Sequence, residues 1–407
     1  MKNILLRTIR RQRGWSQKQL ADFACVSLST IERAERGETI RVDNIERICV
    51  CLQKSPEELG LIKTENQEIN RYKANKTVVN LVDGLTNASS VIDTSFEERL
   101  SKALAKPASI DSQVLQGLEY ITNSYWQLRS GLGYSSLIKG FLGHLGTVEQ
   151  LLKHAYSPSV HVHLCSIVSE IAQCIGAIYF DMSNYSLAKP YYKVSIEAAR
   201  EANNHILWVI SLGRMSSLPI YNNKSHEAIP FLQEAQRVAI FHSSPQVKAW
   251  LASLEAEAQA NLHNRAYCMQ LLGHAERALE NVKQEESPFD VKFDYARLAG
   301  YKGICYLYLQ KPKEALEALN ESVKSIDSIA VRQRSIITAD IAAAYTQMEE
   351  IPAACSSASQ ALELNRSTKS SLVLQRLRKV RTSMRPWEAT QIVKDFDAQM
   401  LLHTTLL

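Results

Sequence analysis

The amino-acid sequence predicts an all-α protein in which a small helical domain precedes a long α-solenoid. Capping and turn residues between positions 7 and 41 are spaced for three short helices, and small residues recur with a period near 40 beyond position 160. A chain of 407 residues is also too long for one small domain. We expect a helical domain over residues 1–60, a linker with a short helix over 61–108, a repeat domain over 109–386 and a carboxy-terminal capping helix over 387–407.

Local signals define the first two helices. Residues 7–13 form a basic helix that Gly14 stops. Ser16 and Gln19 then have the spacing of a capping box, which predicts a second helix over residues 17–23.

The third helix is predicted between Ser27, which can cap its start, and Gly37, which can end it. Helical periodicity gives this domain an inner and an outer face. The inner positions are Leu20, Ala21, Ile31 and Ala34, and the outer positions of the third helix are Leu28, Ser29 and Arg33.

The segments SQKQLA, ACVS, STIERAERG and SPEELG resemble the lambda-repressor-like (Xre/Cro) helix-turn-helix family over roughly residues 5–60. The resemblance implies a sequence-specific transcriptional regulator that binds a double-stranded DNA operator. It implies that Gln17 meets a phosphate and braces the reading side chains, and that Arg10 pairs with Glu35. The implied base-edge contacts are Ser27, Leu28, Ser29 and Arg33, with Thr30 and Arg41 toward the DNA backbone. An unrelated helical bundle with solvated charges is the alternative interpretation.

Charge supports DNA binding only mildly. Residues 1–60 contain eleven Lys and Arg against eight Asp and Glu, and five of the eleven lie in the first thirteen residues. This predicts binding that weakens as salt rises. The whole chain has a net charge of +5 and no long block of like charges.

The start MKNILLRTIRRQ has no apolar run long enough for a signal peptide, and we expect no later stretch to approach the ~20 apolar residues of a membrane span. We expect a cytoplasmic protein that does not contact a membrane. The eight cysteines are scattered singly, which is typical of free thiols in a reducing compartment.

No catalytic or cofactor motif stands out, since HExxH, GxxxxGK[ST] and GxSxG are all absent. The segment HVHLC could offer His161, His163 and Cys165 as metal ligands. On a helix, however, residues i and i+2 point to different faces, so we expect these three not to converge and predict no metal site. The sequence therefore predicts neither an enzyme nor a cofactor.

Beyond residue 160, five repeats share one spacing of small and core residues. Each repeat begins with a small residue, and Ala or Cys follows twelve positions later. A core residue lies four positions after this Ala or Cys, and another small residue lies seven positions after it. Small residues at these places let two antiparallel helices approach closely, and each pair must stack on the next. The five sets are Gly176/Ala188/Tyr192/Ser195, Ser216/Ala228/Leu232/Ala235, Ala256/Cys268/Leu272/Ala275, Gly303/Ala315/Leu319/Ser322 and Ala342/Ala354/Ala358/Ala361.

The pattern resembles tetratricopeptide repeats, which implies a right-handed α-solenoid. With the small residue of each set as the eighth place, the first helices of such repeats line a concave groove. The resemblance places eight residues of this sequence there: Gln173, Arg214, Tyr221, Glu257, Asn261, Arg297, Tyr308 and Gln347. Residues 111–156 are helical in pattern and predict an irregular leading repeat. An unrelated helical bundle is again the alternative.

Together, the two domains resemble the cytoplasmic peptide-pheromone receptors of Gram-positive bacteria, the Rap, Rgg, Npr, Plc and Prg superfamily. That resemblance implies a quorum-sensing homodimer in which a short peptide lies in the groove and changes dimer geometry at the operator. In the groove, Arg214 and Arg297 could hold a carboxylate and Asn261 could bond an extended backbone. A solenoid that grips a partner protein, with no small signal, is the alternative function.

Overall fold

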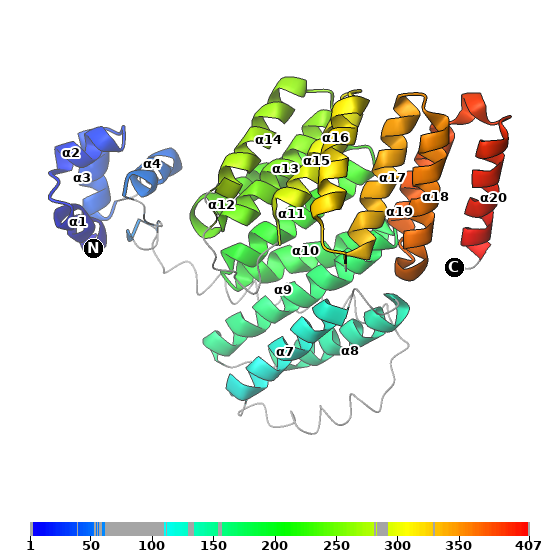
Figure 1. The fold of residues 1–407 in the computed structure, drawn as a ribbon. Coiled ribbons are helices and arrows are strands. Elements are labelled where there is room, and N and C mark those ends of the chain that lie inside the picture. The colour runs from blue at the N-terminus through cyan, green and yellow to red at the C-terminus, as the bar shows by residue number, and fades with distance from the viewer. Residues whose placement is uncertain are drawn as a thin grey trace. The chain divides into compact units, whose positions relative to one another are not determined.

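The computed structural model describes residues 3–61 and 110–405, apart from residues 39, 53, 55, 57, 58, 111, 129–133, 154–156, 281, 283–291 and 329. The chain divides into two compact units, Met1–Asn75 and Lys76–Leu407, each described here by itself. Their described residues form helices and no β-strand, which confirms the all-α prediction (Figure 1). The predicted linker over residues 61–108 lies, except for its first residue, outside the described residues.

The first unit contains four helices in its described part: α1 (Ile4–Gln12), α2 (Gln17–Phe23), α3 (Leu28–Arg36) and α4 (Val42–Leu52). The predicted bounds of the first helix are wrong at its start, because the Asn3 side chain accepts a hydrogen bond from the Leu6 N–H and caps the helix there.

The predicted caps of α2 and α3 are confirmed. Ser16 and Gln19 form a reciprocal capping box, and the Ser27 side chain accepts from the Thr30 N–H. Gly37 ends α3 with a left-handed backbone of φ 75°, which a residue with a Cβ rarely adopts.

The core of the first unit is small and apolar. It includes all four predicted inner residues, and its fully or nearly fully buried members are Leu6, Leu20, Ala21, Ala24, Ile31, Ala34, Ile48, Cys49, Leu52 and Leu59.

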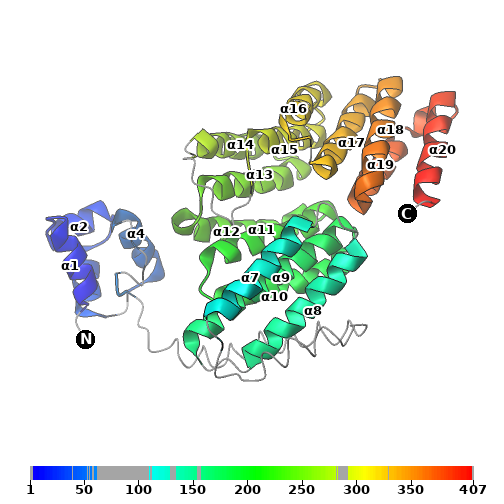
Figure 2. The same ribbon diagram turned by 60° about the horizontal axis from the view of Figure 1, so that its bottom comes forward.

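In the second unit, an initial hairpin is followed by five antiparallel helix pairs (Figures 1 and 2). The hairpin, α7 (Ser112–Leu128) and α8 (Tyr134–Lys153), packs on the first helix of the first pair. The pairs are α9 (Pro158–Asp181) with α10 (Tyr185–Glu201), α11 (His205–Tyr221) with α12 (Ile229–His242), α13 (Pro245–Asn261) with α14 (Arg265–Glu280), α15 (Tyr295–Tyr308) with α16 (Pro312–Ser325), and α17 (Val331–Gln347) with α18 (Ile351–Thr368).

These pairs are the five predicted repeats, and every one of the predicted anchor residues is buried. The close approach that small anchors allow is visible at Gly176, where an added Cβ would lie 2.7 Å from the ring of Tyr192, the third anchor of the same set. Gly303 faces Leu319 in the same way. The solenoid prediction is therefore confirmed, and the small residues serve helix contact.

Two further helices follow the fifth pair. The helix α19 (Ser371–Ser383) packs on α17 and also reaches α9, far back in the chain, so the stack curls until its end meets its beginning. The last helix, α20 (Gln391–Thr405), packs on α18 with Val393 and Phe396 buried.

The expectation that no stretch of the chain approaches the length and apolarity of a membrane span is wrong for one helix. The helix α9 is long and apolar enough to cross a membrane, with a mean hydropathy of 1.4 over its most apolar window. However, 78% of that window is buried inside the protein, as in the core helix of a soluble domain, so this is weak evidence for a span.

Candidate functional site

The outer face of α3 carries the predicted DNA-contact residues. Leu28, Ser29 and Arg33 are exposed, as predicted from helical periodicity. The Ser27 hydroxyl at the start of the helix lies 2.8 Å from the hydroxyls of both Ser29 and Thr30, which fixes these short side chains together. The outer face of α3 therefore presents hydroxyl groups and one apolar side chain at its start and a guanidinium in its last turn.

A buried ion pair supports this face from behind. Nε of Arg10 lies 2.5 Å from Oε1 of Glu35, and the two side chains are only 8% and 6% exposed. The Gln17 amide donates to Glu35 Oε2 at 2.8 Å. The predicted pair is thus confirmed, and the chain Arg10–Glu35–Gln17 links α1, α3 and α2.

Two cations of the basic run at the amino terminus serve the fold of the first unit. Arg10 is buried in the ion pair, and Arg13 donates to the backbone oxygen of Leu52 at 2.6 Å, at the end of α4. Cations suit a helix carboxy terminus because its last carbonyls have no partner within the helix. Of the described residues in this run, Arg7 and Arg11 are the exposed cations that do not serve the fold in this way.

Arg41, the other predicted backbone contact, is exposed just before α4. Arg33 lies 3.3 Å from Glu38, and about half of each side chain is exposed. An exposed pair of this kind contributes little to stability, so the Arg33 guanidinium can exchange Glu38 for another acceptor.

The eight predicted groove residues do not form one open surface. Gln173 is buried and accepts from Arg214 Nε at 3.2 Å, and the Arg214 guanidinium lies 5.1 Å from the Trp126 ring centre. Arg297 pairs with Asp294 within one helical turn at 2.6 Å. Gln347 is exposed and donates to the Leu307 backbone oxygen. Both predicted carboxylate-binding arginines, Arg214 and Arg297, therefore already have partners within the protein.

Three other predicted groove residues, Tyr221, Glu257 and Tyr308, surround an arginine that sequence reasoning did not select. Arg376 on α19 donates to the Tyr221 hydroxyl at 2.8 Å and pairs with Asp340 on α17. Next to it, Tyr185 on α10 donates to Gln375 at 2.8 Å. We call Tyr221, Glu257, Tyr308, Asp340 and Arg376 the arginine cluster.

The arginine cluster is electrostatically strained by burial. The side chain of Glu257 is 2% exposed, and its burial raises the pKa to about 7, although Arg376 acts in the opposite direction. Burial likewise raises the pKa of Asp340 more than Arg376 lowers it. Glu257 Oε1 has no hydrogen-bond partner among the described residues. Arg376, with a smaller contribution from Lys379, thus serves two buried carboxyl groups, and burial still raises the pKa of both.

Part of this cluster was within reach of the sequence. Asp340 occupies the sixth place of the fifth repeat, the place that Arg214 occupies in the second, so the same register selects it. Arg376 lies beyond the last repeat, where the register has no place for it.

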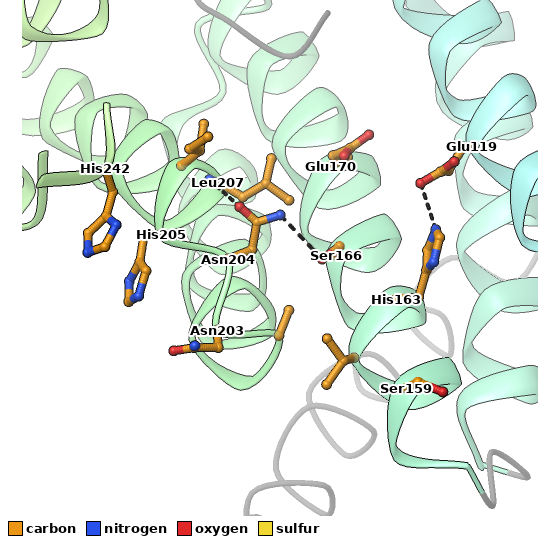
Figure 3. A pocket seen from close by; sticks show the side chains of 13 residues that line it. Glu119, Ser159, His163, Ser166, Glu170, Asn203, Asn204, His205, Leu207 and His242 are labelled. Atoms are coloured by element: carbon orange, nitrogen blue, oxygen red, sulfur yellow. Dashed lines mark hydrogen bonds and ion pairs between the residues drawn. The ribbon is translucent and has the colours of Figure 1, made fainter. Parts of the chain in front are cut away.

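A separate cleft of about 560 Å³ opens at the edge of the first two helix pairs (Figure 3). His163 lies 2.6 Å from Glu119 across it, and the rings of His205 and His242 stack at 4.0 Å. Glu170 lines the cleft too, and its burial, with a smaller contribution from Glu119, raises its pKa to about 8. None of the predicted groove residues lines this cleft.

The HVHLC segment is only partly as expected. His163 indeed points away, toward Glu119. His161 and Cys165 do converge, because they are four residues apart on α9, and Glu201 from α10 joins them. The three residues of the segment do not converge, as predicted, but the prediction overlooked the i+4 spacing that brings His161 and Cys165 together.

Comparison with known proteins identifies the first unit. Residues 6–59 match the helix-turn-helix family model. The amino-terminal domain is a helix-turn-helix domain. None of the curated proteins matches the chain.

Among solved structures, the chain is similar to the crystal structure of Rap protein complexed with competence and sporulation factor. The identity is 9%, the match covers 72% of this chain and 98% of that one, and the TM-score is 0.46. A likeness this remote decides nothing about function.

Proposed function

We propose that this protein is a non-enzymatic transcriptional regulator whose repeat domain senses a short peptide and thereby controls operator binding. The helix-turn-helix match and the exposed face of α3 support the DNA-binding half of the proposal. Ser27, Leu28, Ser29 and Arg33 would contact base edges, while Gln17, Thr30 and Arg41 would position the domain on phosphates.

DNA recognition of this kind works best as a dimer. Two copies would place their α3 helices in successive major grooves about 34–36 Å apart, and the repeat units would hold that spacing. We infer a cytoplasmic homodimer on a palindromic operator.

The peptide half of the proposal rests on one observation. Three predicted groove residues, Gln173, Glu257 and Asn261, each have a buried polar atom with no hydrogen-bond partner among the described residues: Nε2, Oε1 and Nδ2 respectively. Buried polar groups are nearly always satisfied, by protein, water or ligand. An extended peptide offers regularly spaced N–H and C=O groups that suit such positions.

The arginine cluster suggests how a peptide would act on the repeats. Arg376 joins α19 to α11 and α17, so its contacts depend on how far the helix stack curls. A peptide that binds one degree of curl more tightly than another shifts the equilibrium between them, and stacked pairs add small rotations along the solenoid. This would serve quorum sensing if the peptide is secreted by the same cells.

The alternative is a repeat domain that binds a partner protein. The same unsatisfied groups would then contact an extended segment of that partner. A native mass spectrum of the protein purified from its own host, compared with the spectrum after denaturation, separates the two. An added mass of a few hundred to about two thousand daltons that denaturation releases supports a peptide, whereas a co-purifying protein chain supports the alternative.

A further inference from the structure

The first helix pair brings three metal-ligating side chains to one point. His161 and Cys165 lie one turn apart on α9, and Glu201 is the last residue of α10. Their ligand atoms all lie within 4.8 Å of one another. His161 Nε2 is 2.5 Å from Glu201 Oε1 and 3.4 Å from Cys165 Sγ.

The donor set suits one class of ion. Zinc binds imidazole nitrogen, thiolate sulfur and carboxylate oxygen, and sites with three protein ligands keep a fourth position open. Metal–ligand bonds of about 2.0–2.3 Å in a tetrahedron put neighbouring donors about 3.3–3.6 Å apart. The sulfur–nitrogen separation of 3.4 Å already fits this range. The histidine–carboxylate contact would have to widen by less than about 1 Å, and the thiol and carboxylate, which lie within 4.8 Å of each other, would have to close to about 3.5 Å.

We propose that His161, Cys165 and Glu201 form a zinc site that clamps the start of α9 to the end of α10. In the metal-free chain, the hydrogen bond between His161 and Glu201 holds two of the ligands near their binding positions. On binding, the Cys165 thiol proton passes to solvent and the imidazole proton is carried on Nδ1, so that Nε2, the thiolate and the carboxylate face the ion. The fourth position is left to water.

The thiol distinguishes this site from an ordinary buried hydrogen bond. A histidine–glutamate pair needs no third donor, yet Cys165 is fully buried directly beside it. The neighbouring His163 provides an internal contrast, because it also bonds a glutamate, Glu119, but is the more exposed of the two histidines. None of the three zinc ligands is a proposed signal-binding residue, although Gln173 lies on the same helix, α9, as His161 and Cys165.

The test uses the full-length chain with Cys25, the exposed cysteine, replaced by serine to remove surface thiol binding. After treatment with a chelator, the chain is titrated with Zn²⁺ against a chromophoric competitor, and separately with Co²⁺. We expect one ion per chain and a cobalt spectrum with a sulfur-to-metal charge-transfer band and tetrahedral ligand-field bands.

Adding Cys165→Ser should abolish the charge-transfer band and weaken zinc binding at least about tenfold, as expected when one of three ligands is lost. The matched controls Cys174→Ser, another buried cysteine of α9, and His163→Gln should leave both unchanged. A Cys25→Ser chain that shows no cobalt–thiolate band, or equal zinc affinity in the Cys165→Ser and Cys174→Ser variants, would overturn the proposal. The cobalt spectrum of the Cys25→Ser chain tests the proposal even if the variants with buried substitutions do not fold.

Discussion

The two units of this protein hold their functional residues in opposite ways. In the first, the predicted contact residues project from α3 into solvent, and the polar network that positions them is buried behind them. In the second, most of the predicted contact residues are themselves buried or paired, and an arginine from a distant helix stands among them. We therefore propose that the first surface binds DNA without rearrangement, whereas a ligand of the second would have to displace contacts within the protein.

The difference follows from how far along the chain each site is assembled. The outer face of α3 is positioned by three helices within about thirty residues, so local caps and one buried ion pair are enough to hold it in place. The arginine cluster joins Tyr221 to Arg376, which are 155 residues apart, so it depends on the curl of the whole stack. A conformational response is therefore expected in the second unit and not in the first.

The largest expected effect is on the buried pair of the first unit. Arg10→Met leaves the Glu35 carboxylate buried without its cation, which should lower the free energy of unfolding of the helix-turn-helix domain by about 3–5 kcal/mol. Arg36→Met, which breaks an exposed pair with Glu38, should lower it far less, because water solvates both charges of an exposed pair. Thermal unfolding followed by circular dichroism measures both. Equal losses would mean that the Arg10–Glu35 pair is not the support of this domain.

A somewhat smaller effect is expected in the arginine cluster. Arg376→Met should destabilise the repeat unit by about 2–3 kcal/mol, because Asp340 and Glu257 then lose their main cation and keep only the weaker influence of Lys379. Adding Asp340→Asn should recover part of this loss, since the amide is neutral. Urea unfolding of the three chains provides the measurement. If the double variant is no more stable than Arg376→Met alone, the pairing with Asp340 is not what holds α19.

DNA binding should change next in size. Arg33→Ala should weaken binding to a duplex operator, selected with the wild-type chain from random sequences, by about 1–3 kcal/mol without loss of helical content. Arg33→Lys keeps the charge but loses the planar fork that reads guanine, so its affinity for random DNA should stay near the wild-type value while its preference for the operator falls. Fluorescence anisotropy measures the affinity of each chain for the operator duplex and for a duplex of random sequence. If both variants prefer the operator as strongly as the wild type does, α3 does not read bases through Arg33.

The smallest expected effect is on the pH dependence of stability, and it follows from a difference between two buried glutamates, one in each unit. Glu35 is buried against Arg10, but Glu170 has no ion-pair cation among the described residues, and its pKa is raised to about 8. The folded state therefore holds a proton that the unfolded state releases near pH 4.5, so stability should fall as pH rises from about 5 to 8.

Glu170→Gln should remove this dependence and stabilise the repeat unit at pH 8 by about 1–2 kcal/mol relative to the wild type. Melting temperatures of both chains at pH 5 and pH 8 provide the test. Parallel pH profiles would show that Glu170 is ionised in the folded state.

How much the sequence could predict follows the same division. The capping box of Ser16, the cap of Ser27 and the stop at Gly37 are each decided by contacts within a few residues, and the structure has all three. The five helix pairs were predictable because a small anchor residue on one helix, such as Gly176 or Gly303, packs against a large side chain on the other helix of the pair, and this leaves a fixed spacing in the sequence. The start of α1 was not, because the Asn3 cap precedes the basic run that defined the prediction.

The contents of the groove were predictable only in part. The repeat register gives the helix face on which Tyr221, Glu257 and Asp340 lie, but it does not give the curl that brings α19 against them. That curl is a sum of small rotations between successive pairs, and no local pattern records it. The convergence of His161, Cys165 and Glu201 likewise required the packing of α10 on α9.

We propose that a ligand of the repeat unit controls DNA binding by the first unit. The test measures the affinity of the full-length chain for its operator, with and without the peptide fraction of host-conditioned medium. It compares the wild type with Asn261→Leu, which removes an unsatisfied amide of α13. We predict that the fraction changes wild-type affinity about 5- to 150-fold and leaves Asn261→Leu, whose affinity without the fraction should be normal, largely unchanged. An equal change in both chains, or a change that survives protease digestion of the fraction, would contradict the account.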